Sequence, residues 1–76
     1  TTEDFRTAVY PNPADDELYI YSDKSILFTT IVDLQGRVVI KHTAGNRIAI
    51  SNLASGAYIA EIKTKDATIK RRWMKM

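Results

Sequence analysis

Short runs in which apolar and polar residues alternate recur along the whole chain and predict β-strands. The clearest run is Glu17–Tyr21, in which Leu18 and Ile20 share one face while Tyr19 and Tyr21 share the other. We therefore expect six or seven strands and no helix. The remaining runs cover residues 28–33, 37–42, 47–50, 57–64 and 67–74, with a weaker first strand at residues 5–10.

The connectors between these runs have the composition of tight turns. Asp33-Leu34-Gln35-Gly36 is typical of a type I hairpin turn followed by a bulge, in which Gly36 supplies the positive φ. Ala44-Gly45-Asn46 and Lys65-Asp66 have the same character. Parallel strands need crossovers of about a dozen residues or more, so the strands must be antiparallel. We predict an all-β fold, an immunoglobulin-like antiparallel β-sandwich of about seven short strands, with a small barrel as the alternative.

Two further segments favour structural roles within such a sandwich. In Tyr10-Pro11-Asn12-Pro13, the prolines remove backbone donors, so the segment is expected to carry the chain from one sheet to the other while Tyr10 anchors the corner. Later, Leu53 is expected to plug an open end of the sandwich and Gly56 to reverse the chain. The Tyr58 hydroxyl is then placed to reach the backbone a few residues upstream, as in a tyrosine corner.

The composition offers no constellation for catalysis or for cofactor binding. The chain has 76 residues, enough for one domain, with no cysteine, one histidine and three scattered glycines, so zinc sites and phosphate loops lack their residues. Asp15-Asp16-Glu17 lacks the ligand spacing of a calcium loop. Ser51 has no suitably spaced base, since His42 is the single histidine. We expect no cofactor, no metal and no enzymatic activity.

Charge is distributed unevenly along the chain. The formal net charge is only +2, but the start is acidic and the residues from 61 onward are basic. Alternation in the last run places Lys70 and Arg72 on one face and Trp73 on the other. This is a poor footprint for nucleic acid, which we do not expect as a partner. The basic residues are either a solvated face or a surface read by a receptor, and the two roles are compatible.

The chain begins Thr1-Thr2-Glu3, without an initiator methionine or an apolar leader. We expect it to be a piece of a longer protein.

The order of the motifs resembles a known family. Val9-Tyr10-Pro11-Asn12-Pro13-Ala14 is followed by Leu18-Tyr19-Ile20, by the segment from Val32 to Val39, by the segment from Ile50 to Tyr58, and by a basic end. Together these are similar to the type A C-terminal sorting domain of the type IX (Por) secretion system of Gram-negative bacteria, from about Val9 to the last residue. The residues that carry the resemblance are Tyr10, Pro11, Asn12, Pro13, Gly36, Arg37, Gly56, Tyr58 and the basic group at the end.

The resemblance implies a function. Residues 9–76 would be a sorting domain that directs a larger, covalently fused N-terminal cargo across the outer membrane, and residues 1–8 a linker to the cargo with a possible first strand. The partners would be the outer-membrane export machinery and a sortase-like protease that usually removes the domain afterwards. The cargo would pass through the periplasm and become secreted or cell-surface bound.

Two surfaces are candidates for contact with a partner. For recognition by the export machinery, we expect the exposed basic residues Arg37, Lys70, Arg72 and Lys75 to be read. Tyr19 and Tyr21 form a second possible contact surface, for a partner or for a homodimer. The alternative function is an immunoglobulin-like accessory module that binds carbohydrate on these tyrosines or spaces domains in a secreted protein.

Overall fold

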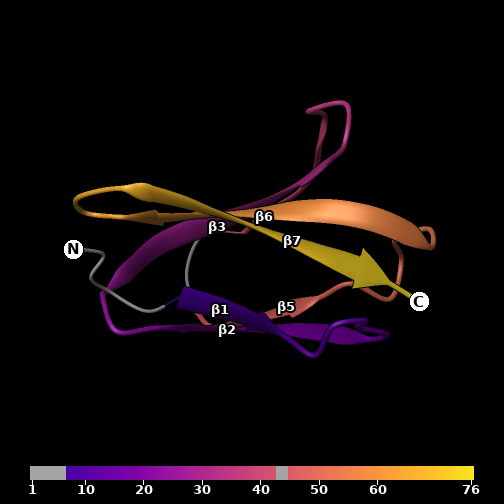
Figure 1. Cartoon of the computed structure of the whole chain (residues 1–76), viewed down its shortest axis with the longest axis horizontal. Coiled ribbons are helices and arrows are strands. Elements are labelled where there is room, and N and C mark those ends of the chain that lie inside the picture. The colour runs from indigo at the N-terminus through magenta and orange to yellow at the C-terminus, as the bar shows by residue number, and fades with distance from the viewer. Residues whose placement is uncertain (1–6, 43–44) are drawn as a thin grey trace.

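In the computed structural model, which describes residues 7–42 and 45–76, the chain forms two β-sheets packed face to face (Figure 1). One sheet has the strand order β1-β2-β5 and the other β4-β3-β6-β7, and the neighbouring strands are antiparallel. The predicted all-β sandwich is confirmed, and the barrel alternative is wrong. The strands are β1 (Thr7–Tyr10), β2 (Glu17–Ser22), β3 (Ile26–Asp33), β4 (Val38–His42), β5 (Arg47–Ala49), β6 (Gly56–Thr64) and β7 (Thr68–Lys75).

The strand bounds follow the alternation closely, with small differences at the ends. β3 begins at Ile26, two residues earlier than expected, and β4 begins one residue later, because Arg37 still belongs to the turn. The first strand is present as Thr7–Tyr10. Residues 5 and 6 of its predicted range, most of the predicted linker, and Ala44 of one predicted turn lie outside the described residues.

The core lies between the sheets and is built from the inward-facing residues of both. Leu18 and Ile20 of β2 face inward, as their alternation predicts, while Tyr19 and Tyr21 face outward. Each fully buried aliphatic side chain contributes about 1.5–3 kcal/mol relative to exposure. The central cluster contains Ala14, Leu18, Ile20, Ile31, Ile48, Ile50, Tyr58, Ala60, Ile62 and Trp73, with Val9, Ile26, Ile40 and Leu53 packed against it.

Two aromatic residues tie β6 to β7 inside this core. The rings of Tyr58 and Trp73 stack with centroids 5.3 Å apart and an interplanar angle of 27°. The Tyr58 hydroxyl donates to the main-chain oxygen of Ala54 at 2.7 Å, so the predicted reach to the upstream backbone is confirmed. Leu53 packs against the core as expected, and Gly56 opens β6 with φ of 150°, a conformation that glycine adopts readily.

The proline segment follows a different path from the one predicted. β1 and β2 belong to the same sheet, so the segment does not transfer the chain between sheets, and Tyr10 is exposed rather than anchoring a corner. Instead, the segment crosses to β7 and returns. The peptide bonds before Pro11 and Pro13 are cis, and Ala14 pairs in parallel with Lys75.

This crossing fastens the end of β7 through three hydrogen bonds. Ala14 donates its amide to the oxygen of Met74, and Met76 donates to the oxygen of Ala14, both at 2.8 Å. The side-chain oxygen of Asn12 accepts from the amide of Met74 at 2.9 Å. This last bond pairs a backbone amide of the edge strand β7 that would otherwise face solvent. We call the segment from Asn12 to Ala14 the clamp.

Candidate functional site

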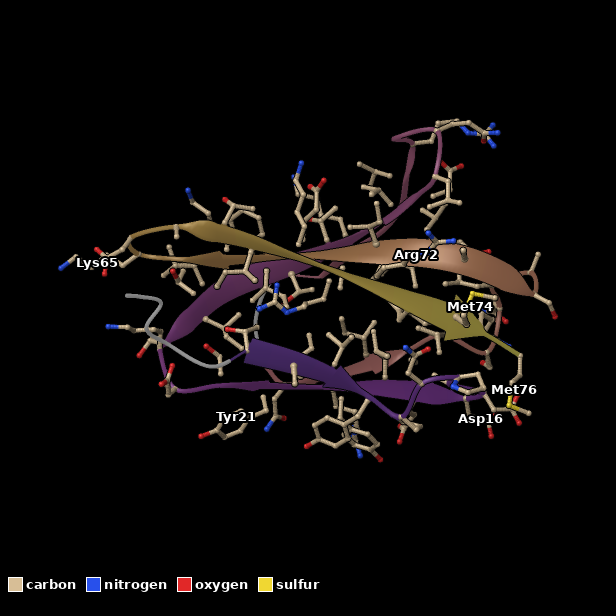
Figure 2. All side chains as sticks on the ribbon, in the orientation of Figure 1. Asp16, Tyr21, Lys65, Arg72, Met74 and Met76 are labelled. Atoms are coloured by element: carbon tan, nitrogen blue, oxygen red, sulfur yellow. The ribbon has the colours of Figure 1, made fainter. Side chains whose placement is uncertain are left out.

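β7 presents basic side chains on the outer surface of the four-stranded sheet. Lys70 and Arg72 are exposed, whereas Ile69 and Trp73 are buried, so the predicted alternation is confirmed. Arg72 lies on β7 (Figure 2). Arg71 points to the inner side at the sheet edge, where its Nε donates to the main-chain oxygen of Thr7 at 3.1 Å. Because β7 is held by β6 along its length, Lys70 and Arg72 are presented at fixed positions.

Lys75 is buried and does not lie on the exposed surface where it was expected. Its side chain is only 7% exposed, since it shares the inner face with Trp73, two residues earlier. The Nζ atom donates to the main-chain oxygen of Met76 at 2.9 Å and lies 3.8 Å from a carboxylate oxygen of Asp15. Lys75 therefore belongs to the contact between β7 and the residues after the clamp, and not to the readable exterior. Side chains alternate between the two faces of a strand, so the sequence of β7 already predicts that Lys75 lies on the same face as Trp73.

The β3–β4 hairpin carries Arg37 on a turn that projects beyond the two layers (Figure 1). The amide of Gly36 donates to the main-chain oxygen of Asp33 at 3.0 Å, and Gly36 has φ of 86°, so the predicted hairpin turn with a positive-φ glycine is confirmed. The carboxylate oxygen Oδ1 of Asp33 accepts from the backbone amides of Gln35 and Arg37, both at 2.9 Å. The other carboxylate oxygen of Asp33, Oδ2, accepts from Arg37 Nε at 2.9 Å. Although the Arg37 side chain is 76% exposed, it is fixed in direction by Asp33.

These contacts lower the pKa of the Asp33 carboxyl below its ordinary value of 3.8, chiefly through the hydrogen bond from the Arg37 amide. A depressed pKa means that the ionised form stabilises the folded hairpin. This contribution is present above the ordinary pKa and is lost as the pH falls through the folded-state pKa. We expect an NMR titration of the Asp33 carboxyl carbon to have its midpoint below 3.8, and the protection of the turn amides against exchange to fall only as this carboxyl becomes protonated. A midpoint at or above 3.8 contradicts the network.

The structure separates Arg37 from the basic residues of β7. The cross-strand pairing runs from Val38 to Val32, to Ile59 and to Arg72, so two strands stand between β4 and β7. With strands about 4.8 Å apart, β4 and β7 are about 14 Å apart. Arg37, next to Val38, thus lies at the same end of the sheet as Arg72 but at its opposite edge. A partner that contacts both must cover the whole width of the sheet.

Tyr19 and Tyr21 lie on the outer surface of the other sheet, as the alternation indicates. Tyr21 is 52% exposed and Tyr19 is partly buried, because Tyr10 of β1 stacks on it with ring centroids 5.7 Å apart. The Tyr19 hydroxyl donates to Glu17 at 2.8 Å, and this hydrogen bond raises the pKa of Tyr19. Arg47 lies 3.6 Å from the other oxygen of Glu17. Sequence reasoning missed Tyr10 here, because its pairing opposite Tyr19 depends on the register of β1.

The described residues offer few features of other kinds of site. No group of three or more histidine and carboxylate side chains is placed to hold a metal ion there, and those residues enclose no pocket. None of the described segments is a helix with the length and apolar character needed to cross a membrane.

Comparison with known proteins gives one match. A family model described as "Secretion system C-terminal sorting domain" matches residues 8–76, which is nearly the whole chain. Searches of curated proteins and of solved structures find no match.

Proposed function

Because this chain belongs to the family of secretion system C-terminal sorting domains, we propose that the export machinery reads its exposed basic side chains. The domain is a C-terminal sorting signal for type IX secretion, fused behind an N-terminal cargo that crosses the outer membrane to become secreted or cell-surface bound. The alternative function as a carbohydrate-binding or spacing module is not favoured.

The observation that carries the proposal is the fixed presentation of Lys70 and Arg72 on β7. Both side chains are exposed on a strand whose inner face carries Trp73, so the core holds the strand in place while the charges face a partner. Arg37 is a second contact, held outward by Asp33. Because the backbone that carries these residues is preorganised, binding requires only the ordering of their side chains. The domain performs no reaction of its own and acts by being recognised.

Removal of the domain after export is also part of the proposal. The cargo reaches the outer membrane from the periplasm, and a sortase-like protease then cuts ahead of the sandwich. Thr7 and Ala8 are paired with Ser22 and Tyr21 in β1, and proteases cut exposed, unpaired backbone in preference to paired strands. We therefore place the cut before Thr7. Mass spectrometry of the released domain tests this, and an N-terminus within β1 would contradict it.

The tyrosine surface remains a second proposed contact, for a partner or for another copy of the chain. Tyr21 and Tyr10 expose about half of their side chains on one flat sheet face, where aromatic area favours association. Export of a Tyr21→Ser variant at the wild-type level would remove this surface from the recognition step. A sedimentation profile that stays monomeric as the concentration rises would exclude another copy of the chain as the partner of this surface.

The experiment that tests the function fuses residues 1–76 to a fluorescent reporter behind an export leader for the inner membrane. The fusion is expressed in two otherwise identical hosts, one with the type IX system and one without it. We expect the reporter outside the cell only in the host with the system. Equal release from both hosts would contradict a sorting function, and retention in both would show that these residues are not a sufficient signal.

A further inference from the structure

The outer face of the four-stranded sheet carries an apolar stripe, a row of apolar side chains across β4, β3 and β6. One cross-strand row joins Val38, Val32 and Ile59 and ends at Arg72. Val38 is 61% exposed at the sheet edge, whereas Val32 is almost fully covered although it lies on the outer face. Met74, on the same face of β7, is also substantially exposed (Figure 2). Apolar side chains that line up across several strands form a surface that favours contact with another molecule.

Basic side chains border this stripe. By the alternation of each strand, the same face presents Lys41 of β4, Lys63 of β6, and Lys70 and Arg72 of β7. Glu61 is the one carboxylate among the described residues of this face, and it pairs directly across from Lys70. The face therefore combines an apolar centre with an excess of positive charge at its borders. That is the arrangement of a protein interface, with an apolar core and a charged rim.

We propose that this face docks onto a protein component of the type IX export machinery whose surface has an apolar ridge flanked by carboxylates. This inference rests on the proposed function and extends it from a few basic residues to a whole sheet face. The apolar stripe supplies most of the affinity, and the basic border sets orientation and speeds encounter. The sheet face reaches from the hairpin to β7, so one partner surface that covers it meets Arg37 and Arg72 together.

Two other occupants fit this face less well. In a symmetric dimer the same patch meets itself, so the basic border would face an identical basic border. A membrane surface is disfavoured because apolar residues that lie level with a flat sheet do not insert into the acyl region as the apolar face of an amphipathic helix does. Charge complementarity thus selects an acidic protein surface.

The test compares three substitutions in the reporter fusion described above. Val38→Glu places a carboxylate at the exposed end of the stripe, where the side chain contributes little to the core. Leu27→Glu is the matched control, because Leu27 is also an exposed apolar residue, at the irregular start of β3 and five residues along that strand from Val32. Met74→Glu is a second probe of the stripe, on β7. We expect the stripe variants to be exported roughly tenfold less than the wild type, and the control to match the wild type.

The outcomes separate this inference from the function itself. If the wild-type fusion is not exported, the sorting function fails. If the wild type and both stripe variants are exported equally, the docking face is wrong while the function stands. Circular dichroism and thermal melts of the purified variants establish that they fold. Flotation of the purified domain with anionic vesicles that Val38→Glu abolishes, or concentration-dependent dimerisation that it abolishes, would assign the face to a membrane or to a second copy and overturn the proposal.

Discussion

Replacing Trp73 with alanine is expected to lower the free energy of unfolding by about 3–5 kcal/mol. Trp73 is fully buried, is the largest side chain in the core and stacks on Tyr58. A domain of 76 residues has a total stability of roughly 4–11 kcal/mol, so a loss of this size removes between about a quarter and all of it. Urea denaturation of the isolated domain, followed by circular dichroism, measures the change.

Trp73→Phe is the more conservative substitution at the same position. It keeps an aromatic ring against Tyr58 and removes the indole Nε1, which is buried without a hydrogen-bond partner. We expect the phenylalanine variant to lose clearly less stability than the alanine variant, because the cavity it leaves is smaller. Equal losses for the two variants would show that the packing of Trp73 is not what matters. Export of the alanine variant should fall together with its folded fraction.

The second large effect concerns export rather than stability. Reversing both charges on the outer face of β7, with Lys70→Glu and Arg72→Glu together, should reduce export of the reporter fusion roughly ten- to a hundredfold. Both side chains are exposed, but Glu61 lies directly across from Lys70, so the free energy of unfolding should fall by up to about 2 kcal/mol. Quantification of the reporter in medium and cell fractions, with denaturation of the purified domain in parallel, measures both quantities.

The control reverses two charges in turns, with Lys24→Glu between β2 and β3 and Lys65→Glu between β6 and β7. It changes the net charge by the same amount, so a general effect of charge would appear in both variants. Export of the Lys70 and Arg72 reversal at the level of this control would refute the recognition role. Truncation of residues 70–76 is a weaker test than charge reversal, because it also removes Trp73 and unfolds the sandwich.

Local alternation was sufficient to predict most of the fold. The inward positions Leu18 and Ile20 and the outward tyrosines follow from a period of two within one strand. The hairpin turn at Gly36 and the hydroxyl reach of Tyr58 follow from residue types at short separations. Each of these features depends on residues within a few positions of one another, which is the range over which a sequence pattern is informative.

The features that were missed depend on pairing between distant segments. The path of Ala14 to β7 spans about sixty residues, and no local signal indicates it. The same holds for Val32, whose near-complete burial on an outer face arises from its neighbours on β4 and β6. Lys75 is an exception, since the parity that buries Trp73 also predicts that Lys75 points inward. The expectation that Lys75 is read by the export machinery rests on its charge alone and disagrees with its position in the strand.

The clamp makes the order of synthesis matter. The segment that receives the end of β7 leaves the ribosome early, whereas β7, with Trp73, is the last of the seven strands to emerge. The two layers therefore cannot close around their core until that strand has been made. A chain that stops before β7 keeps the clamp but lacks the strand that it fastens, together with Lys70 and Arg72. Recognition of the complete sandwich therefore requires that translation has run through β7.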